Sequence, residues 1–187
     1  MRSSSRLLLV ILFLLALFVL FETLGIRAQF NLDALQALLL MHPVVGLLLF
    51  TLLFALGNLI QIPGWVFLAA AVLALGRVYG GVVTYIAACV SCTVTYITIR
   101  YLGGNALREL NNPLAQRLLS GLDRHPLASI ISLRMLFQTV PALNYALALS
   151  GVRFRTYLLG TLLGLPLPIA LYCVFFDYLA MLLNITH

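Results

Sequence analysis

The stretch LRMLFQTVPALNYALALSG, residues 133–151, is apolar enough to enter a bilayer, yet it contains an arginine near one end and a proline and an asparagine at its centre. Proline removes a backbone hydrogen-bond donor and interrupts a helix. An arginine inside a membrane is costly unless it is paired or hydrated. The stretch therefore predicts two short helices around an interruption at 139–141, in a place where the rest of the chain supplies polar surroundings.

The composition of the whole chain predicts an all-α membrane protein. The 187 residues are 63% hydrophobic and 9% charged, whereas soluble domains have about 25% charged residues. The eleven cations are all arginine, and with five carboxylates they give a net charge of +6. Because the arginines lie mostly between apolar runs, we expect them to orient the chain and to meet anionic lipid headgroups. Membrane lipids are the expected partners and nucleic acid is not; self-association stays open.

The first 42 residues predict an anchor followed by an interfacial helix. Arg2 and Arg6 precede an apolar run that continues to about residue 25, close to the roughly 20 residues that span a bilayer. We interpret residues 1–28 as an uncleaved signal anchor; a cleaved signal peptide is the alternative. Residues 29–42 predict an amphipathic helix that lies in the membrane interface.

Residues 43–76 form an uncharged run that is too long for one span and too short for two. Gln61-Ile62-Pro63-Gly64 interrupts it near its middle. Two short helices that meet at a polar break indicate a re-entrant hairpin, which is tolerated where protein or a water-filled cavity covers the open backbone. The alternative is one full span followed by a loop and an interfacial helix.

The second half of the chain repeats this order. Residues 82–99 predict a clean span, and residues 104–125 predict a polar cytoplasmic linker divided at Asn111-Asn112-Pro113. A second hairpin then precedes a span at 157–179, in which Pro166 and Pro168 predict a kink. We therefore expect two inverted repeats, 43–103 and 126–182, within one membrane domain of residues 43–182. Inverted repeats in transporters commonly hold substrate between interrupted helices near the bilayer midplane.

The arginine positions favour the hairpin interpretation. With the amino terminus in the cytoplasm and both hairpins re-entrant, only Arg27 and Arg77 face the outside. That distribution agrees with the positive-inside rule. The arginines then on the cytoplasmic side are Arg2, Arg6, Arg108, Arg117, Arg124, Arg153 and Arg155. We expect a multi-pass protein of a bacterial inner membrane with a cytoplasmic amino terminus.

Several short motifs, in this order, resemble the DedA superfamily, also called the VTT or SNARE-associated Golgi protein family. The first half carries Ile62-Pro63-Gly64, Gly76, Gly80-Gly81 and the run from Tyr96 to Arg100. The second half carries Arg134, Pro141, Asn144-Tyr145, Gly151 and the run from Gly160 to Pro166. The resemblance covers about residues 43–180 and is greatest to the Golgi-vesicle-protein branch.

This resemblance implies two opposed re-entrant hairpins and the movement of lipids between leaflets, since some bacterial relatives transport undecaprenyl phosphate and eukaryotic ones scramble phospholipids. The chain also departs from the family. Trp65 stands where members of the bacterial core branch often have a carboxylate, Phe137 where many relatives have proline, and Ala71 or Ala74 where glycine is frequent. The missing acid argues against proton-coupled active transport.

Five polar residues are candidates for binding a lipid headgroup: Arg134, Arg100, Asn144, Gln138 and Gln61. Arginine suits a phosphate because its planar fork donates two parallel hydrogen bonds. The structural alternatives are snorkelling of Arg134 or its pairing with Asp177, and snorkelling of Arg100 to the interface. Asn144, Gln138, Thr139, Gln61 and Asn58 lie near the breaks formed by Pro63, Gly64 and Pro141, where they could instead satisfy freed backbone groups.

Other candidate chemistry is weaker. Asp177 and Glu22 are the carboxylates within or near spans and are the candidate proton sites, although structural pairing explains them too. Cys89 and Cys92 form a C-x-x-C motif inside a span, where close helix packing is a simpler explanation than redox chemistry. We expect no metal, no cofactor and no enzymatic activity. The predicted function is lipid movement; the alternatives are proton-coupled transport of a small solute or ion, thiol oxidoreduction, and membrane assembly without transport.

Overall fold

The computed structural model describes residues 8, 10–16, 19, 23, 37, 39–109 and 112–182. It is helical throughout these ranges, with no strand among them. Most of the predicted anchor and interfacial helix, including Glu22, lies outside the described residues. Residues 10–16 are helical, and Val10 is buried against Gly103 and Leu149.

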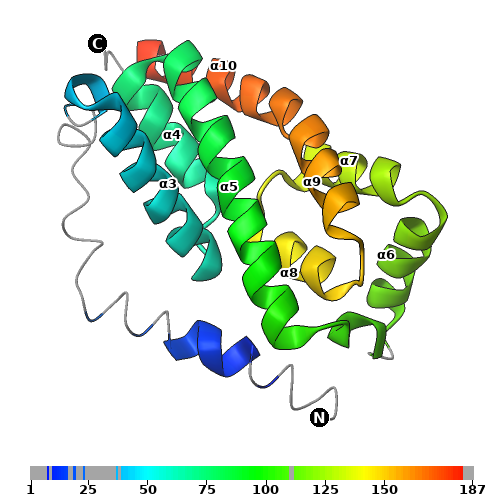
Figure 1. The fold of residues 1–187 in the computed structure, drawn as a ribbon. Helices are drawn as coiled ribbons and strands as arrows, with labels where there is room; N and C mark the ends of the chain where they lie inside the picture. The colour runs from blue at the N-terminus through cyan, green and yellow to red at the C-terminus, as the bar shows by residue number, and fades with distance from the viewer. Residues whose placement is uncertain are drawn as a thin grey trace.

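The uncharged run forms two helices, as its central break predicts. Helix α3 covers Pro43–Leu59 and helix α4 covers Gly64–Leu75. Figure 1 shows them side by side and antiparallel. The chain reverses at Gln61, whose φ of 71° lies in the left-handed region, and Pro63, which lacks an N–H, precedes α4.

Helix α5, Arg77–Gly103, runs through the centre of the molecule and is longer than the predicted span. It begins after Gly76, whose φ is +77°, and it packs against α3, α4, α8, α9 and α10. A side chain at Gly80 would strike the backbone of Ala71, so glycine lets α4 approach α5 closely.

The second half begins with the linker and a second helix pair. The linker holds a short 3₁₀ helix, Ala106–Glu109, and helix α6, Pro113–Arg124. Helices α7, Pro126–Phe137, and α8, Pro141–Leu149, then flank the predicted interruption. Gln138 has a φ of 50°, so each interruption contains a glutamine in the left-handed region that is followed by a proline. That shared conformation was not predicted.

Helices α9, Phe154–Gly164, and α10, Pro166–Leu182, form the last stretch, and the prediction of a kink at Pro166 is confirmed. The ring of Pro166 clashes with the preceding turn and its nitrogen donates no hydrogen bond, which interrupts the helix at Leu165. By length and composition, two stretches of the described chain could cross a membrane: Arg77–Gly103 and Phe154–Leu182.

Two apolar clusters hold the helices together. One joins α3, α4, α5 and α10 around Phe50, Phe54 and Phe67. The other joins α5, α7, α8 and α9 around Ile130, Leu147 and Tyr157. The outward face of α10 is also apolar, with Leu171, Val174, Phe175, Tyr178 and Met181 all exposed. A continuous exposed apolar surface of this kind is expected of a face that contacts lipid.

An ion pair joins the two halves of the linker, its arginine also bonds the helical body, and the pair should make stability depend on pH. Arg108 donates from Nη1 and Nη2 to the Asp123 carboxylate at 3.2 and 2.6 Å, and from Nε to the Ser150 carbonyl at 2.6 Å. The hydrogen bonds from Arg108 lower the pKa of Asp123. The charged carboxylate therefore stabilises the fold above the ordinary aspartate pKa of about 3.9, and this contribution is lost as the pH falls through the lower folded-state value.

Asp123→Asn is accordingly expected to lower thermal stability slightly at neutral pH, with a difference from wild type that shrinks below about pH 4. Salt should reduce the same difference, because the pair is solvent-exposed. Thermal unfolding in detergent across this pH range measures it. Glu109→Gln is the matched control, since Glu109 forms no ion pair with any described residue. A difference that stays constant with pH would contradict the assignment.

Candidate functional site

Arg134 lies on α7, one turn before the interruption, and it is completely buried. Its guanidinium donates in three directions: from Nη1 to the Asn144 Oδ1 at 2.6 Å and the Gln138 carbonyl at 3.0 Å, from Nη2 to the Tyr157 hydroxyl at 2.8 Å, and from Nε to the Thr161 hydroxyl at 3.3 Å. The Tyr157 ring centroid lies 5.4 Å from the guanidinium carbon. Arg134 thus joins α7 to α8 and α9.

Asn144 extends this arrangement into the first half of the chain. Its Nδ2 donates to Asn58 Oδ1 at 3.0 Å, and Asn58 Nδ2 donates to Ser91 Oγ at 3.0 Å. The hydroxyl of Tyr145 donates to the carbonyls of Asn58 and Leu59, which α3 leaves open at its end. These side chains, which we call the polar network, run from Thr161 through Arg134, Asn144 and Asn58 to Ser91.

The polar network contains no carboxylate among the described residues. The alternative pairing of Arg134 with Asp177 is wrong: Asp177 lies beside Arg77, with 3.5 Å between its Oδ2 and the arginine Nη1. A buried cation without a counterion is stable only if dipoles replace its hydration. Two hydroxyls, one amide oxygen and one backbone carbonyl do so here.

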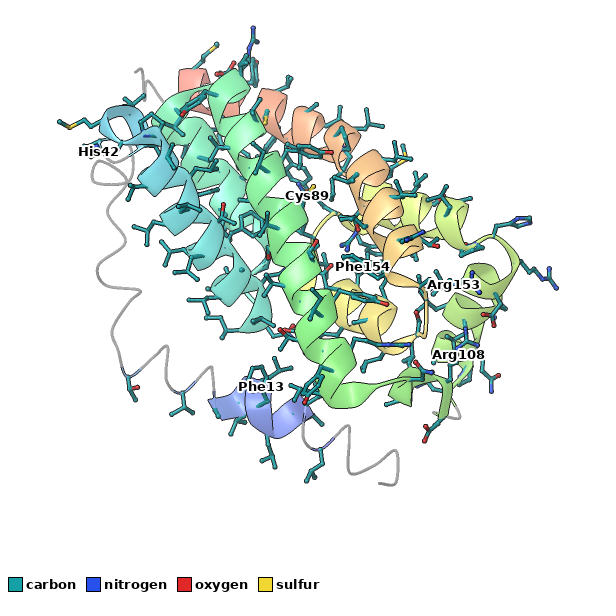
Figure 2. All side chains as sticks on the ribbon, in the orientation of Figure 1. Phe13, His42, Cys89, Arg108, Arg153 and Phe154 are labelled. Carbon is teal, nitrogen blue, oxygen red and sulfur yellow. The ribbon has the colours of Figure 1, made fainter. Side chains whose placement is uncertain are left out.

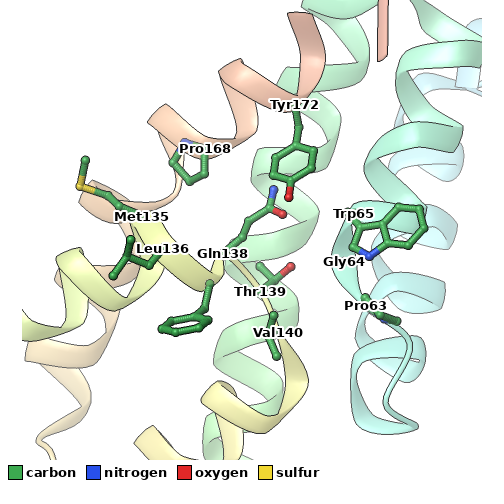
Figure 3. Close-up of a pocket in the computed structure, with 11 residues that line it drawn as sticks. Pro63, Gly64, Trp65, Met135, Leu136, Gln138, Thr139, Val140, Pro168 and Tyr172 are labelled. Carbon is green, nitrogen blue, oxygen red and sulfur yellow. The ribbon is translucent and has the colours of Figure 1, made fainter. Parts of the chain in front are cut away.

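The two interruptions, which are far apart in sequence, lie against each other. A Cβ added to Gly64 would overlap Thr139 Oγ1 and would lie 3.0 Å from Thr139 Cβ. Beside this contact is a pocket of about 130 Å³, between α4 on one side and α7 and α10 on the other. Figure 3 shows its lining, with the Gln138 amide directed toward Tyr172 and Thr139 directed toward the start of α4. We call this space the tip pocket.

The structure separates the five predicted binding residues. Arg134 and Asn144 are buried in the polar network. Gln138 contributes its carbonyl to that network and its side chain to the tip pocket. Arg100 is half-buried, with Nη1 at 3.3 Å from the Gly104 carbonyl and 3.4 Å from the Ala148 carbonyl, and Gln61 is exposed at the first interruption. Whether any of them binds a lipid stays a prediction.

The sequence did not predict that Tyr157, Thr161 and Tyr172 belong to the site, nor that Ser91 does. Tyr157 and Thr161 are spaced i, i+4 on α9, so both reach Arg134 from one helix face. That spacing was the available signal, but tyrosine in a membrane helix more often marks the interface. Tyr172 lies on α10 beyond Pro168, and its position over the pocket depends on the path of α10 past α7.

The C-x-x-C motif lies within the packed helices. Cys89 and Cys92 are free and buried on α5, and Cys92 Sγ donates to Asn144 Oδ1 at 3.6 Å. Cys173 is also free and buried. Figure 2 shows Cys89 on the central helix among the surrounding side chains. Enclosed thiols of this kind are expected to be structural, because reactive cysteines occupy accessible, electropositive sites.

Comparison with known proteins identifies the family. The VTT domain model matches residues 62–178, which is more than half of the chain and includes the end of the first interruption and all of the second. No curated protein and no solved structure matches the chain. The matched range starts at Ile62-Pro63-Gly64 and includes the second helix pair and most of the last span. The chain therefore belongs to the VTT-domain family, the DedA superfamily of membrane proteins.

Proposed function

We propose that this protein moves lipids between the two leaflets of a membrane, along the place where its two interrupted helix pairs meet. The observation that supports this most is the tip pocket. Its floor is polar, from Gln138 and Thr139, whereas its rim exposes Trp65, Leu136 and Phe137. A surface of that kind matches an amphiphile, whose headgroup enters while its chains stay in the hydrocarbon.

The proposed topology follows from the arginine distribution and the helix lengths. In it, α3 with α4 and α7 with α8 are re-entrant hairpins from opposite faces, and α5 and α9 with α10 are spans. At 1.5 Å per residue, a twelve-residue helix such as α4 or α7 is about 18 Å long, short of the roughly 30 Å hydrocarbon core. The halves are then inverted repeats, with the amino terminus in the cytoplasm of a bacterial cell.

The residues predicted to bind lipid have distinct proposed roles. Arg134 and Asn144 act from behind the pocket, where they hold the ends of α7 and α3 in place through direct hydrogen bonds. Gln138 contacts the headgroup. Arg100, Arg153 and Arg155 attract anionic headgroups at the cytoplasmic surface, and Gln61 hydrates the exposed turn of the first hairpin.

Reconstitution tests the proposal. Purified protein in vesicles of phosphatidylcholine and phosphatidylglycerol is expected to accelerate the exchange of fluorescent phospholipid between leaflets, measured by dithionite quenching against protein-free vesicles. The rate should not need a proton gradient, because no acid lines the tip pocket within the described part of the chain. If vesicles with the protein exchange every lipid tested no faster than protein-free vesicles do, lipid movement is rejected. Uptake of a solute that depends on pH and is abolished by Asp177→Asn would favour proton-coupled transport instead.

A further inference from the structure

The tip pocket contains polar side chains that are buried but have no partner. Gln138 is 8% exposed and Thr139 is 2% exposed. Neither the Gln138 amide nor the Thr139 hydroxyl forms a hydrogen bond to another described residue, and both line the pocket. Buried polar groups in proteins are almost always hydrogen-bonded, to protein, water or ligand. The polar atoms of these two side chains are not fully enclosed, as those of Thr84 and Thr95 are, but open onto the pocket, so a polar group that enters it can bond them.

The start of α4 adds donors to the same place. Gly64 and Trp65 are the first two residues of this twelve-residue helix, and both line the pocket. The first N–H groups of a helix have no partner within it and carry a partial positive charge. No side chain caps α4, because its N-cap residue is Pro63. An oxygen-rich group in the pocket could accept hydrogen bonds from these amides, from Thr139 and from the Gln138 amide.

The ring of side chains around these donors identifies a lipid as the occupant. Met135, Leu136, Phe137 and Trp65 surround the polar floor and are all 44% exposed or more. Tyr172 adds a hydroxyl at the same rim. A free anion would gain nothing from an apolar rim, whereas lipid chains would pack on it while the headgroup reaches the floor.

The lining of the pocket also restricts the charge of that headgroup. Among the described residues, no arginine, histidine, aspartate or glutamate lines it. Arg134 donates from Nη1 to the Gln138 backbone carbonyl but does not line the pocket, and four protein oxygens already hold its guanidinium. A phosphate monoester carries about −1.5 to −2 charges at pH 7, and burying it without a cation is costly. A phosphodiester has a single charge, which a zwitterionic headgroup balances itself.

We infer that the tip pocket binds the phosphodiester of a phospholipid through neutral donors. This inference rests on the proposed lipid movement. Gln138, Thr139 and the amino end of α4 are the contacts. A zwitterionic headgroup is therefore preferred to one with a net negative charge, and polyprenyl phosphates, which are monoesters, are excluded. This narrows the two lipid classes suggested by family resemblance to one.

The test compares three fluorescent lipids in vesicles of phosphatidylcholine and phosphatidylglycerol: phosphatidylcholine, phosphatidylglycerol and a short polyprenyl phosphate. Wild type is expected to move phosphatidylcholine fastest, phosphatidylglycerol more slowly and the polyprenyl phosphate not at all. Gln138→Leu with Thr139→Val keeps the shape of the floor but removes its donors, and should slow both phospholipids about ten-fold or more. Thr95→Val is the matched control. Thr95 lies outside the pocket, and its hydroxyl is buried and has no hydrogen-bond partner.

The outcomes separate the inference from the proposed function. A double variant that is folded and as fast as wild type would overturn the pocket assignment while lipid movement stands, and so would transport of the polyprenyl phosphate. If the double variant does not fold, wild type is instead crosslinked to a phosphatidylcholine that has a photoreactive headgroup. Crosslinking of wild type at residues 137–140 supports the inference, and crosslinking confined to other segments overturns it. No movement of any lipid by wild type would reject the proposed function itself.

Discussion

Arg134→Ala is expected to lower the free energy of unfolding by about 2–5 kcal/mol, the range for truncating a large, fully buried side chain to alanine. The substitution deletes the donor shared by Asn144, Tyr157 and Thr161, and it leaves a cavity between α7 and α9. It also removes a buried charge, which by itself would be favourable. The lost hydrogen bonds and the cavity should outweigh that gain, since four acceptors lose the same donor at once.

Two further variants separate the causes. Arg134→Lys retains the charge, but its three donor hydrogens sit on one nitrogen and cannot reach the four acceptors that the three guanidinium nitrogens reach, so it should recover little of the loss. Arg134→Met fills much of the volume without the charge and measures how much of the loss is cavity. Chemical unfolding in detergent, followed by circular dichroism, gives the free energies, and Arg155→Ala on the exposed surface of α9 is the control. A lysine variant as stable as wild type would show that charge alone matters and that the fork geometry does not.

The prolines allowed the helix boundaries to be predicted. Pro63, Pro141 and Pro166 each lack a backbone donor, and a helix starts immediately after Pro63 and at each of the other two. These boundaries depend on local chemistry, so one residue suffices to predict them. The left-handed conformation at Gln61 and Gln138 was not predicted, because glutamine has no preference for it and the enclosing helices impose it.

The partners of the polar side chains could be predicted only in part. Arg134 and Asn144 both lie near the second interruption, so their contact was within reach of the sequence. Asn58 meets Asn144 although 86 residues separate them, which depends on how α3 packs beside α5. Asp177 pairs with Arg77 rather than Arg134 because α10 carries it toward the start of α5. Gln61 is exposed and Gln138 is buried for the same reason. The two glutamines have the same local conformation, and only tertiary packing gives them different exposure.

Gly64→Ala tests the contact between the two interruptions and is expected to destabilise the protein by about 1–3 kcal/mol, as overpacking of a close contact does. The added methyl group would overlap Thr139 Oγ1, with Thr139 Cβ at 3.0 Å and the Phe54 ring at 3.1 Å. The φ angle of Gly64 is not positive, so the backbone does not require glycine there. Helix propensity would even favour alanine. The approach of Thr139, with a smaller contribution from the Phe54 ring, therefore explains a loss of stability, and the methyl group should also push the two interruptions apart and slow lipid exchange.

A double-mutant cycle with Thr139→Gly isolates that contact, because Thr139→Gly removes both of the threonine atoms that the methyl group would strike. The combined variant is expected to be more stable than the sum of the two single effects predicts, by about 0.5–3 kcal/mol. Gly121→Ala is the matched control: its nearest neighbour, Ser129 Oγ, lies at an ordinary 3.5 Å, so alanine should be neutral or stabilising within α6. Additive losses in the cycle would mean that Gly64 and Thr139 do not touch. The tip pocket would then have no basis, because it lies between α4 and the second interruption only if that contact holds them together.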